Sequence, residues 1–300
     1  MGATGNVGQA ILDSILATGI HKVSVITRSE SSSSSKLPDS VIIHRGSYTD
    51  ESFLVAALAG QDILILAVSF MSYSAQDPII RAAAKAGVPW ILPTEYGSDP
   101  EASLNKDLPL NSHKVPFREL IEELGTSNWI GLSTNPWLDY CLLQGGFVGI
   151  DIKQKTAQLY GNGEVKANFT ALPRVGSTAA ALLSLPDTEL SKFKNRFVYT
   201  SSVRVSQRDI LESALRVTGT TEDQWTVEYK DTAEAIHGLK ERMASGDMMA
   251  GAQLLFALTF SDGLGGDFND KVVDYEGLLG LEKEESLDDI VKQVVAKLGA

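Results

Sequence analysis

Short apolar runs alternate with helix-like segments along the first 134 residues, and this alternation restricts the possible folds more than any other feature of the sequence. Residues 62–68 (DILILAV) are almost continuously apolar, as expected of a strand buried on both faces. Residues 9–18 carry apolar side chains at three- and four-residue spacing, which is typical of an amphipathic helix. The alternation predicts an α/β fold, a doubly wound parallel sheet with helices on both faces.

A glycine-rich segment, GATGNVG at residues 2–8, opens directly into the first predicted helix. Glycines let a main chain approach a pyrophosphate closely, and the first helical turn offers N–H groups and the positive end of the helix dipole. A glycine-rich helix start without a ligand has the same appearance, but the alternation that follows favours a dinucleotide site. The residues expected to contact this cofactor are Gly2, Thr4, Gly5, Asn6, Val7 and Gly8.

The strand that normally precedes such a loop is not evident, because Met1 stands where that strand should end. In a doubly wound sheet the first strand is central, so its loss leaves a gap between two neighbouring strands. We therefore expect the first strand to be missing or truncated, and the N-terminus of this chain to be incomplete.

The end of the next predicted strand indicates which dinucleotide is bound. NAD-specific sites usually place an acidic residue there to bind the ribose 2′-hydroxyl, whereas this strand ends Ile26-Thr27-Arg28. A guanidinium suits a 2′-phosphate, because it can donate two parallel hydrogen bonds. Arg28 therefore favours NADP(H) over NAD(H), and Lys36, beyond a serine run, is a second candidate cation.

The regular alternation of strand-like and helix-like segments ends at about residue 134, so two regions are expected. Residues 1–134 are predicted to form the NADP-binding domain, with its N-terminal strand absent. Residues 135–300 are predicted to form a smaller mixed α/β region on the substrate side, which contributes in part to the same sheet. Within it, Ser206 and Asp209 predict a capping box at a helix start.

Charge and composition disfavour several classes of partner and site. The net charge of −12 disfavours nucleic acids and anionic membranes, since both repel an acidic surface. A single cysteine, Cys141, cannot form an internal disulfide, and the four histidines lie in no metal-binding pattern. Neither a long apolar run nor a secretory signal is evident. We expect a cytoplasmic monomer or homodimer that binds a small molecule, but no metal, nucleic acid or membrane.

Four segments, taken in order, carry a resemblance to a known family. They are GATGNVG at 2–8, ITR at 26–28, AGVPWILPTEYGSD at 86–99 and KVPFRELIE at 114–122. Together they resemble the NmrA-like and isoflavone-reductase-like branch of the short-chain dehydrogenases. Each segment is weak evidence alone, but the combination is specific. The later segments LTFSDGLGGDFND and EGLLGL extend the likeness along nearly the whole chain.

The resemblance implies a Rossmann-type domain that binds NADP(H), in an atypical reductase of aromatic or conjugated compounds. It assigns the general acid/base to Lys114, which matches the lysine of the family motif. The Tyr-x-x-x-Lys pair of most short-chain dehydrogenases is absent, as expected of this branch. Independently of the resemblance, hydride transfer builds negative charge on the substrate, which a nearby ammonium stabilises and protonates. Pro116 places Lys114 in or just before the first helical turn.

Polar residues at the ends of predicted strands complete the expected site, since ligands of such sheets bind at the carboxyl edge. Ser69 and Thr94 are expected near the nicotinamide or its ribose, although a turn or a helix cap would use the same hydroxyls. Tyr96, Asn135 and Trp137 are expected to shape the substrate pocket, and a core position is equally compatible with Trp137.

Three functions fit this pattern. The first is an NADPH-dependent reductase in which Lys114 assists the chemistry. The second is a non-catalytic NAD(P)-binding redox sensor of the NmrA type, which needs no proton donor. The third is an epimerase-like enzyme with retained NAD, which the missing Tyr-x-x-x-Lys pair disfavours. The presence of Lys114 favours the reductase.

Overall fold

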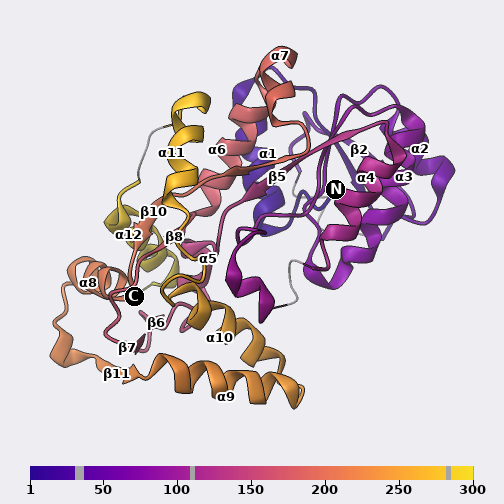
Figure 1. Cartoon of the computed structure of the whole chain (residues 1–300). Coiled ribbons are helices and arrows are strands. Elements are labelled where there is room, and N and C mark those ends of the chain that lie inside the picture. Colours follow the sequence, from indigo (N-terminus) through magenta and orange to yellow (C-terminus); the bar gives the residue numbers. More distant parts are fainter. Residues whose placement is uncertain (31–36, 109–111, 282–284, 300) are drawn as a thin grey trace. The chain divides into compact units, whose positions relative to one another are not determined.

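The computed structural model describes residues 1–30, 37–108, 112–281 and 285–299, and the chain divides into two compact units (Figure 1). Each unit combines several stretches of the chain. Unit 1 comprises Met1–Tyr96, Leu110–Ser133 and Val175–Val198. Unit 2 comprises Gly97–Pro109, Thr134–Arg174 and Tyr199–Ala300. None of the described helices is long and apolar enough to cross a membrane.

Helices and strands alternate along unit 1, as the apolar runs predict. Its helices are α1 (Asn6–Thr18), α2 (Glu51–Leu58), α3 (Gln76–Ala86), α4 (Val115–Leu124) and α7 (Asp187–Leu190), with 3-10 turns at Phe70–Ala75 and Ser191–Phe193. Its strands are β1 (Ser24–Thr27), β2 (Ile42–Arg45), β3 (Ile63–Ile65), β4 (Trp90–Leu92) and β5 (Asn128–Ser133). Helix α6 (Leu172–Leu183) begins in unit 2, and strand β9 (Arg196–Tyr199) ends there.

Two sheets form the centre of unit 1. The larger has the strand order β3-β4-β5-β9, and the ladders from β3 to β5 are parallel, with Ile63 opposite Trp90 and Trp90 opposite Asn128. The smaller sheet pairs β1 with β2, also in parallel. Helices α2, α3 and α4 lie side by side in Figure 1, and their core includes the fully buried Leu54 and Ile80. These layers confirm the predicted α/β architecture.

The strands of unit 1 are divided where the sequence predicts a missing strand. β1 and β3 are edge strands of separate sheets, and a groove of about 510 Å³ runs along them, lined in part by Ile26 and Ile63. Met1 lies against the β3 edge. Its nitrogen donates to the Ile65 oxygen at 2.7 Å, and its oxygen accepts from the Ala67 N–H at 3.0 Å. This is the hydrogen-bond pattern of parallel strands.

Unit 2 contains two small sheets and several helices. One sheet has the order β11-β7-β6, and the other pairs β10 with β8 in antiparallel fashion. Its strands are β6 (Ile150–Asp151), β7 (Thr156–Tyr160), β8 (Ala167–Phe169), β10 (Val203–Val205) and β11 (Thr226–Lys230). Its helices are α5 (Leu138–Leu143), α8 (Gln207–Thr218), α9 (Thr232–Ala244), α10 (Met248–Thr259), α11 (Asn269–Leu279) and α12 (Leu287–Leu298), with 3-10 turns at Ser103–Lys106 and Glu222–Gln224.

The start of α8 shows the predicted capping box. The Ser206 hydroxyl accepts a hydrogen bond from the Asp209 N–H, and the Asp209 carboxylate accepts one from the Ser206 N–H. These two bonds pair N–H groups that a helix start otherwise leaves without partners. The core of unit 2 includes the fully buried Leu138, Leu159 and Phe169.

Candidate active site

The glycine loop of unit 1 folds tightly against the end of β3. Gly2 has a φ of +82°, and a Cβ at this position would overlap the main-chain oxygen of Ala67. A Cβ at Gly8 would overlap the main-chain oxygen of Gly2. Both positions therefore require glycine, one by backbone conformation and close approach, and the other by close approach alone.

The loop leads into the N-terminus of α1, whose first turn suits an anion. Gly5 caps this helix without a side-chain hydrogen bond, and the first turn holds no acidic residue. Thr4, Gly5 and Asn6 are exposed, whereas Val7 is buried and belongs to the core. An exposed N-terminus at the positive end of a 13-residue helix fits the pyrophosphate of a dinucleotide.

The cation predicted for the 2′-phosphate lies on the surface after β1. The Arg28 side chain is 65% exposed, and its Nε lies 4.0 Å from a Glu30 carboxylate oxygen. This exposed pair is weak, so Glu30 competes little with a phosphate for the guanidinium. Lys36, the second predicted cation, lies outside the described residues.

The hydroxyls predicted near the nicotinamide differ in their surroundings. Ser69 is exposed after β3, at the start of a 3-10 turn. Thr94 is buried after β4, where its hydroxyl donates to the Leu66 oxygen at 3.1 Å and accepts from the Val68 N–H at 3.2 Å. The Gln76 side chain accepts from the Thr94 N–H at 3.0 Å. Thr94 thus ties the ends of β3 and β4 together, and its direct contact with a cofactor stays a prediction.

Lys114 is the N-cap residue of α4, in agreement with the position predicted from Pro116. Its side chain is 8% exposed, and its amine donates a short hydrogen bond to the Glu95 main-chain oxygen. The Glu95 carboxylate lies 3.9 Å from the same amine and receives a 2.5 Å hydrogen bond from Arg118. These three groups, which we call the Lys114 cluster, bring the segment after β4 together with the start of α4, and Arg118 is the one that is only partly buried.

Burial controls the charge of the Lys114 cluster. Loss of solvent lowers the pKa of Lys114 below its usual value, the Glu95 carboxylate opposes this effect, and the Arg118 guanidinium adds to it. Burial also raises the pKa of Tyr96, and it raises the pKa of Tyr73 to about 12, with the Glu95 charge adding to both shifts. Both phenols are therefore neutral near pH 7, and the lysine is the group whose proton is held least firmly.

Tyr96, predicted to contact the substrate, has two unusual features. Its φ is +23°, in a region that non-glycine residues rarely occupy, and its side chain is buried. Among the described residues, its hydroxyl is one of three buried side-chain atoms that have no hydrogen-bond partner. A strained backbone and an unsatisfied buried polar atom each cost free energy, and such costs are concentrated at functional sites.

The other two predicted substrate residues belong to unit 2. Asn135 also has a positive φ, +51°, and its amide nitrogen donates to the oxygens of Asn168 and Gly266 at 3.1 and 2.7 Å. Its Oδ1 atom is buried without a partner in the described structure. The Trp137 ring donates to the Thr134 hydroxyl at 3.2 Å and is half-buried. Asn135 thus shares with Tyr96 a positive φ and an unsatisfied buried atom, although asparagine adopts this conformation readily.

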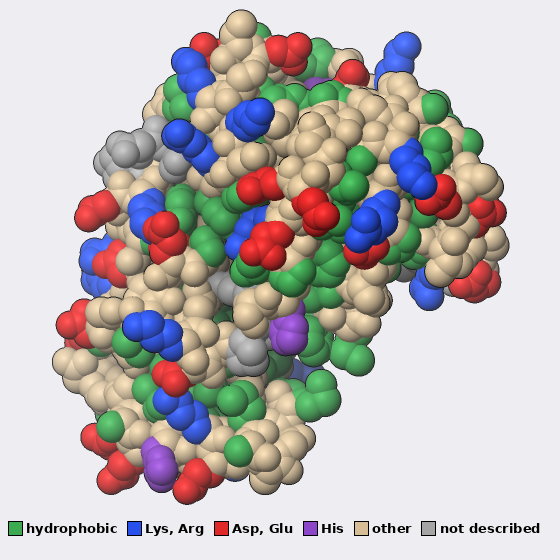
Figure 2. Space-filling model, turned by 45° about the vertical axis from the view of Figure 1, so that its right-hand side comes forward, with side chains coloured by type: hydrophobic (Ala, Val, Ile, Leu, Met, Phe, Trp, Pro, Cys, Tyr) green, Lys and Arg blue, Asp and Glu red, His purple; other side chains and the backbone are tan. Residues whose placement is uncertain are grey.

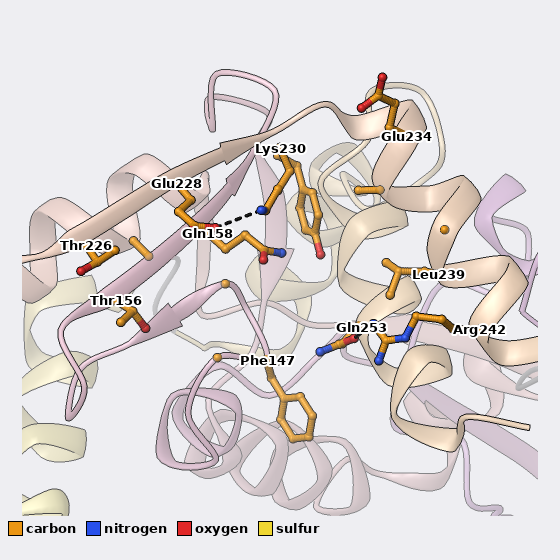
Figure 3. Close-up of a pocket in the computed structure, with 16 residues that line it drawn as sticks. Phe147, Thr156, Gln158, Thr226, Glu228, Lys230, Glu234, Leu239, Arg242 and Gln253 are labelled. Atoms are coloured by element: carbon orange, nitrogen blue, oxygen red, sulfur yellow. Dashed lines mark hydrogen bonds and ion pairs between the residues drawn. The ribbon is translucent and has the colours of Figure 1, made fainter.

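A separate cavity of about 600 Å³ opens in unit 2, among β7, β11, α9 and α10 (Figure 3). Several of its side chains pair with one another: Lys230 lies 2.9 Å from Glu228, and Arg242 donates to Gln253 at 3.2 Å. Its lining includes none of the residues predicted for the site.

No described group of His, Cys, Asp and Glu side chains could hold a metal ion. On the face drawn in Figure 2, acidic and basic side chains are interspersed.

Sequence reasoning identified Lys114 but assigned no role to its two partners in the cluster. Arg118 stands four residues after Lys114, a spacing that puts two side chains on one face of a helix. Glu95 ends the predicted strand that precedes this helix. The signals were therefore present, but the pairing depends on how the chain after β4 folds against α4.

Comparisons with known proteins agree with this architecture. Residues 1–255 match the model of the NmrA-like family. The oxidoreductase aprR of Aspergillus flavus is 28% identical over 98% of this chain and 97% of its own length. The oxidoreductase poxI of Penicillium oxalicum is 30% identical over 98% of this chain and 92% of its own. The leucoanthocyanidin reductase–NADPH complex from Vitis vinifera has a TM-score of 0.75 at 19% identity, covers 98% of both chains, and shows a shared fold.

Proposed function

Because this chain belongs to the NmrA-like family, we propose that it is an NADPH-dependent reductase of a small aromatic or conjugated organic molecule. The buried amine of Lys114 is the observation that carries this proposal. It lies at the start of α4, next to the end of a parallel strand, with a pKa below the usual value for lysine. Buried titratable groups with a shifted pKa and a specific charged partner are concentrated at catalytic sites.

The glycine loop and Arg28 support NADPH as the cofactor. Gly2 and Gly8 allow the close turn, α1 presents its N-terminus, and Arg28 offers an exposed guanidinium for a 2′-phosphate. Bound NADPH would supply the hydride of the reduction. The named oxidoreductases among the relatives are consistent with this chemistry.

The residues of this chain supply the proton and the surroundings. The Lys114 ammonium donates its proton to the substrate oxygen or carbon that gains negative charge, and hydride plus proton complete a two-electron reduction. Burial strengthens the attraction between the ammonium and this developing charge. Tyr96, in the same unit as Lys114, is proposed to bind a polar atom of the substrate with its unsatisfied hydroxyl.

Replacement of Lys114 by methionine tests the proposal, since methionine has a similar length but no amine. Purified wild type and Lys114→Met are compared in NADPH oxidation with a panel of quinones, enones and aromatic carbonyls. We expect kcat to fall by at least about 100-fold, the usual worth of a positioned proton donor. NADPH affinity, measured by calorimetry, should change far less.

Lys85→Met is the matched control. Lys85 lies on α3, and its amine forms an exposed ion pair with a carboxylate oxygen of Glu51 at 2.6 Å. It should retain the kcat of the wild type. If the wild type and both variants bind NADPH but none of them reduces any substrate of the panel, the proposal fails. A non-catalytic dinucleotide sensor would then explain the results better.

A further inference from the structure

We propose that Glu95 and Arg118 are positioning residues for Lys114: Glu95 holds the amine in place, and Arg118 engages the Glu95 carboxylate so that the amine remains able to release its proton. The inference rests on the proposed role of Lys114 as proton donor. It assigns different roles to two contacts of the Lys114 cluster. The hydrogen bond to the Glu95 main chain fixes the position of the amine, and the Glu95–Arg118 ion pair sets the charge around it.

The geometric contact is made by the main chain. The Lys114 amine donates to the main-chain oxygen of Glu95, in the segment that follows β4. The strand end is itself fixed through Thr94, whose hydroxyl and N–H bond to Leu66, Val68 and Gln76. A substitution that changes only the Glu95 side chain therefore leaves this anchor in place.

The charge contact is made by the two side chains. Arg118 donates to one Glu95 oxygen at 2.5 Å, whereas the Lys114 amine lies 3.9 Å from the other. The guanidinium offsets the charge of the carboxylate, so the two side chains together are close to neutral. The Lys114 ammonium is then the excess charge of a desolvated group of three, which is the state that favours release of a proton.

Two aromatic rings hold the guanidinium on the carboxylate. The Arg118 guanidinium carbon lies 5.6 Å from the centre of the Trp129 ring and 5.1 Å from that of Phe197. The two rings contact each other edge to face, with their centres 5.2 Å apart. The Arg118 side chain is 13% exposed, so its contacts with the two rings are largely shielded from water. These contacts keep the guanidinium on the Glu95 carboxylate, so that the carboxylate does not pair with the lysine instead.

Other titratable groups near the cluster contribute little charge. Tyr73 and Tyr96 lie within the field of Glu95, and both have a raised pKa, so both are neutral phenols near pH 7. Glu95 and Arg118 are the charged residues that act on Lys114 in the described structure. The charge that Lys114 experiences is thus set by one carboxylate and one guanidinium.

Opposite charge changes at these two residues test the inference directly. NMR of protein labelled with 15N and 13C in its lysines follows the titration of the Lys114 amine, assigned from the spectrum of Lys114→Met. Arg118→Met leaves the carboxylate to the lysine, so the Lys114 pKa should rise by at least about one unit. Glu95→Gln leaves two neighbouring cations, so the same pKa should fall by at least about one unit. A purely structural role predicts no such opposition.

Three further variants keep the test decisive. Arg118→Lys retains the positive charge and should titrate close to the wild type, even if Arg118→Met proves unstable. The double variant Glu95→Gln/Arg118→Met removes both charges, so its titration should fall between those of the single variants. Arg81→Met, which breaks the exposed pair of Arg81 with Asp77, is the control and should leave Lys114 unchanged.

The kinetic consequence follows the same sign. If the ammonium is the proton donor, activity declines as pH rises through the Lys114 pKa. The alkaline limb of kcat/KM for NADPH oxidation should therefore move to higher pH in Arg118→Met and to lower pH in Glu95→Gln. If the Lys114 pKa is unchanged in both variants, or shifts in the same direction in both, the inference is overturned. Titrations that move as expected in a protein without reductase activity support it, and contradict the proposed function instead.

Discussion

Two cations of unit 1 show that surroundings decide what a charged side chain can do. Arg28 is 65% exposed, and its guanidinium can donate two parallel hydrogen bonds, which suits the binding of a dianionic phosphate. Lys114 is 8% exposed and has a lowered pKa, which suits the transfer of a proton. An arginine at position 114 would not serve this role, because a buried guanidinium cannot give up its proton.

Removal of the exposed cation should change cofactor preference. In Arg28→Ala we expect NADPH affinity to fall by at least about tenfold, since a hydrogen bond to a charged group contributes roughly 1.5–3 kcal/mol. NADH lacks the 2′-phosphate, so its affinity should stay close to that of the wild type. Calorimetric titration of both nucleotides measures the difference. Equal losses for NADPH and NADH, or no loss for either, would remove Arg28 from the phosphate site.

Elements that lie within a long apolar or periodic stretch could be predicted, as β3 could from the seven-residue run 62–68, and short strands outside such stretches could not. The residue-9 helix and the strands around residues 25 and 64 appear as α1, β1 and β3. The two-residue strand β6 and the three-residue strands β8 and β10 have too few residues to show a period. They exist because a partner strand supplies their hydrogen bonds, which is information that a single stretch of sequence does not carry.

The candidate site could be predicted to a similar extent. The glycine spacing and Lys114 were evident because each has a local pattern, a loop before a helix and a lysine at a helix start. The roles of Glu95 and Arg118 were not, because the ion pair joins residues 23 positions apart. The strain at Tyr96 was also invisible, since nothing in a sequence marks a tyrosine with positive φ.

The glycine loop depends on contacts that leave no room for a side chain, and Gly8→Ala tests this at the level of the element. The new Cβ would overlap the Gly2 oxygen, so the loop must move away from the start of α1. We expect a lower Tm and at least about a tenfold loss of NADPH affinity, because the pyrophosphate site and the loop share this geometry.

Gly238→Ala provides the matched control. Gly238 lies inside α9, and a Cβ there has nothing within 4 Å. Alanine favours a helix by about 0.5–1 kcal/mol over glycine, so this variant should be as stable as the wild type or more stable. A Gly8→Ala protein that melts and binds NADPH like the control would contradict the close approach seen in the structure.

At the scale of the whole molecule, the division of the sheet in unit 1 follows from one local observation in the sequence. The strand expected ahead of the glycine loop has no counterpart among the described residues, and the structure separates β1–β2 from β3–β4–β5–β9. The assembly of each unit from separate stretches of chain, such as 175–198 in unit 1, has no comparable local signal. A functional boundary at residue 134 stays a prediction.

The groove between β1 and β3 should accept an extended apolar segment. We consider this chain with six alternating valine and isoleucine residues fused ahead of Met1. Met1 already pairs in parallel with the β3 edge through Ile65 and Ala67, so the fused residues continue in register along Ile63 and Leu64. Each residue would pair with two edges and bury apolar surface, and Tm should rise by at least about 5 °C in calorimetry.

A fused segment of six glycine and serine residues is the control, because it has the same length but little tendency to form a buried strand. Its Tm should match that of the unfused chain. The decisive measurement is amide hydrogen exchange at the edges of β1 and β3, since ladder hydrogen bonds protect N–H groups from solvent. Protection that appears with the apolar segment alone means that one strand joins both sheets. Equal melting temperatures and equal exchange for the two fusions would mean that the groove does not accept a strand.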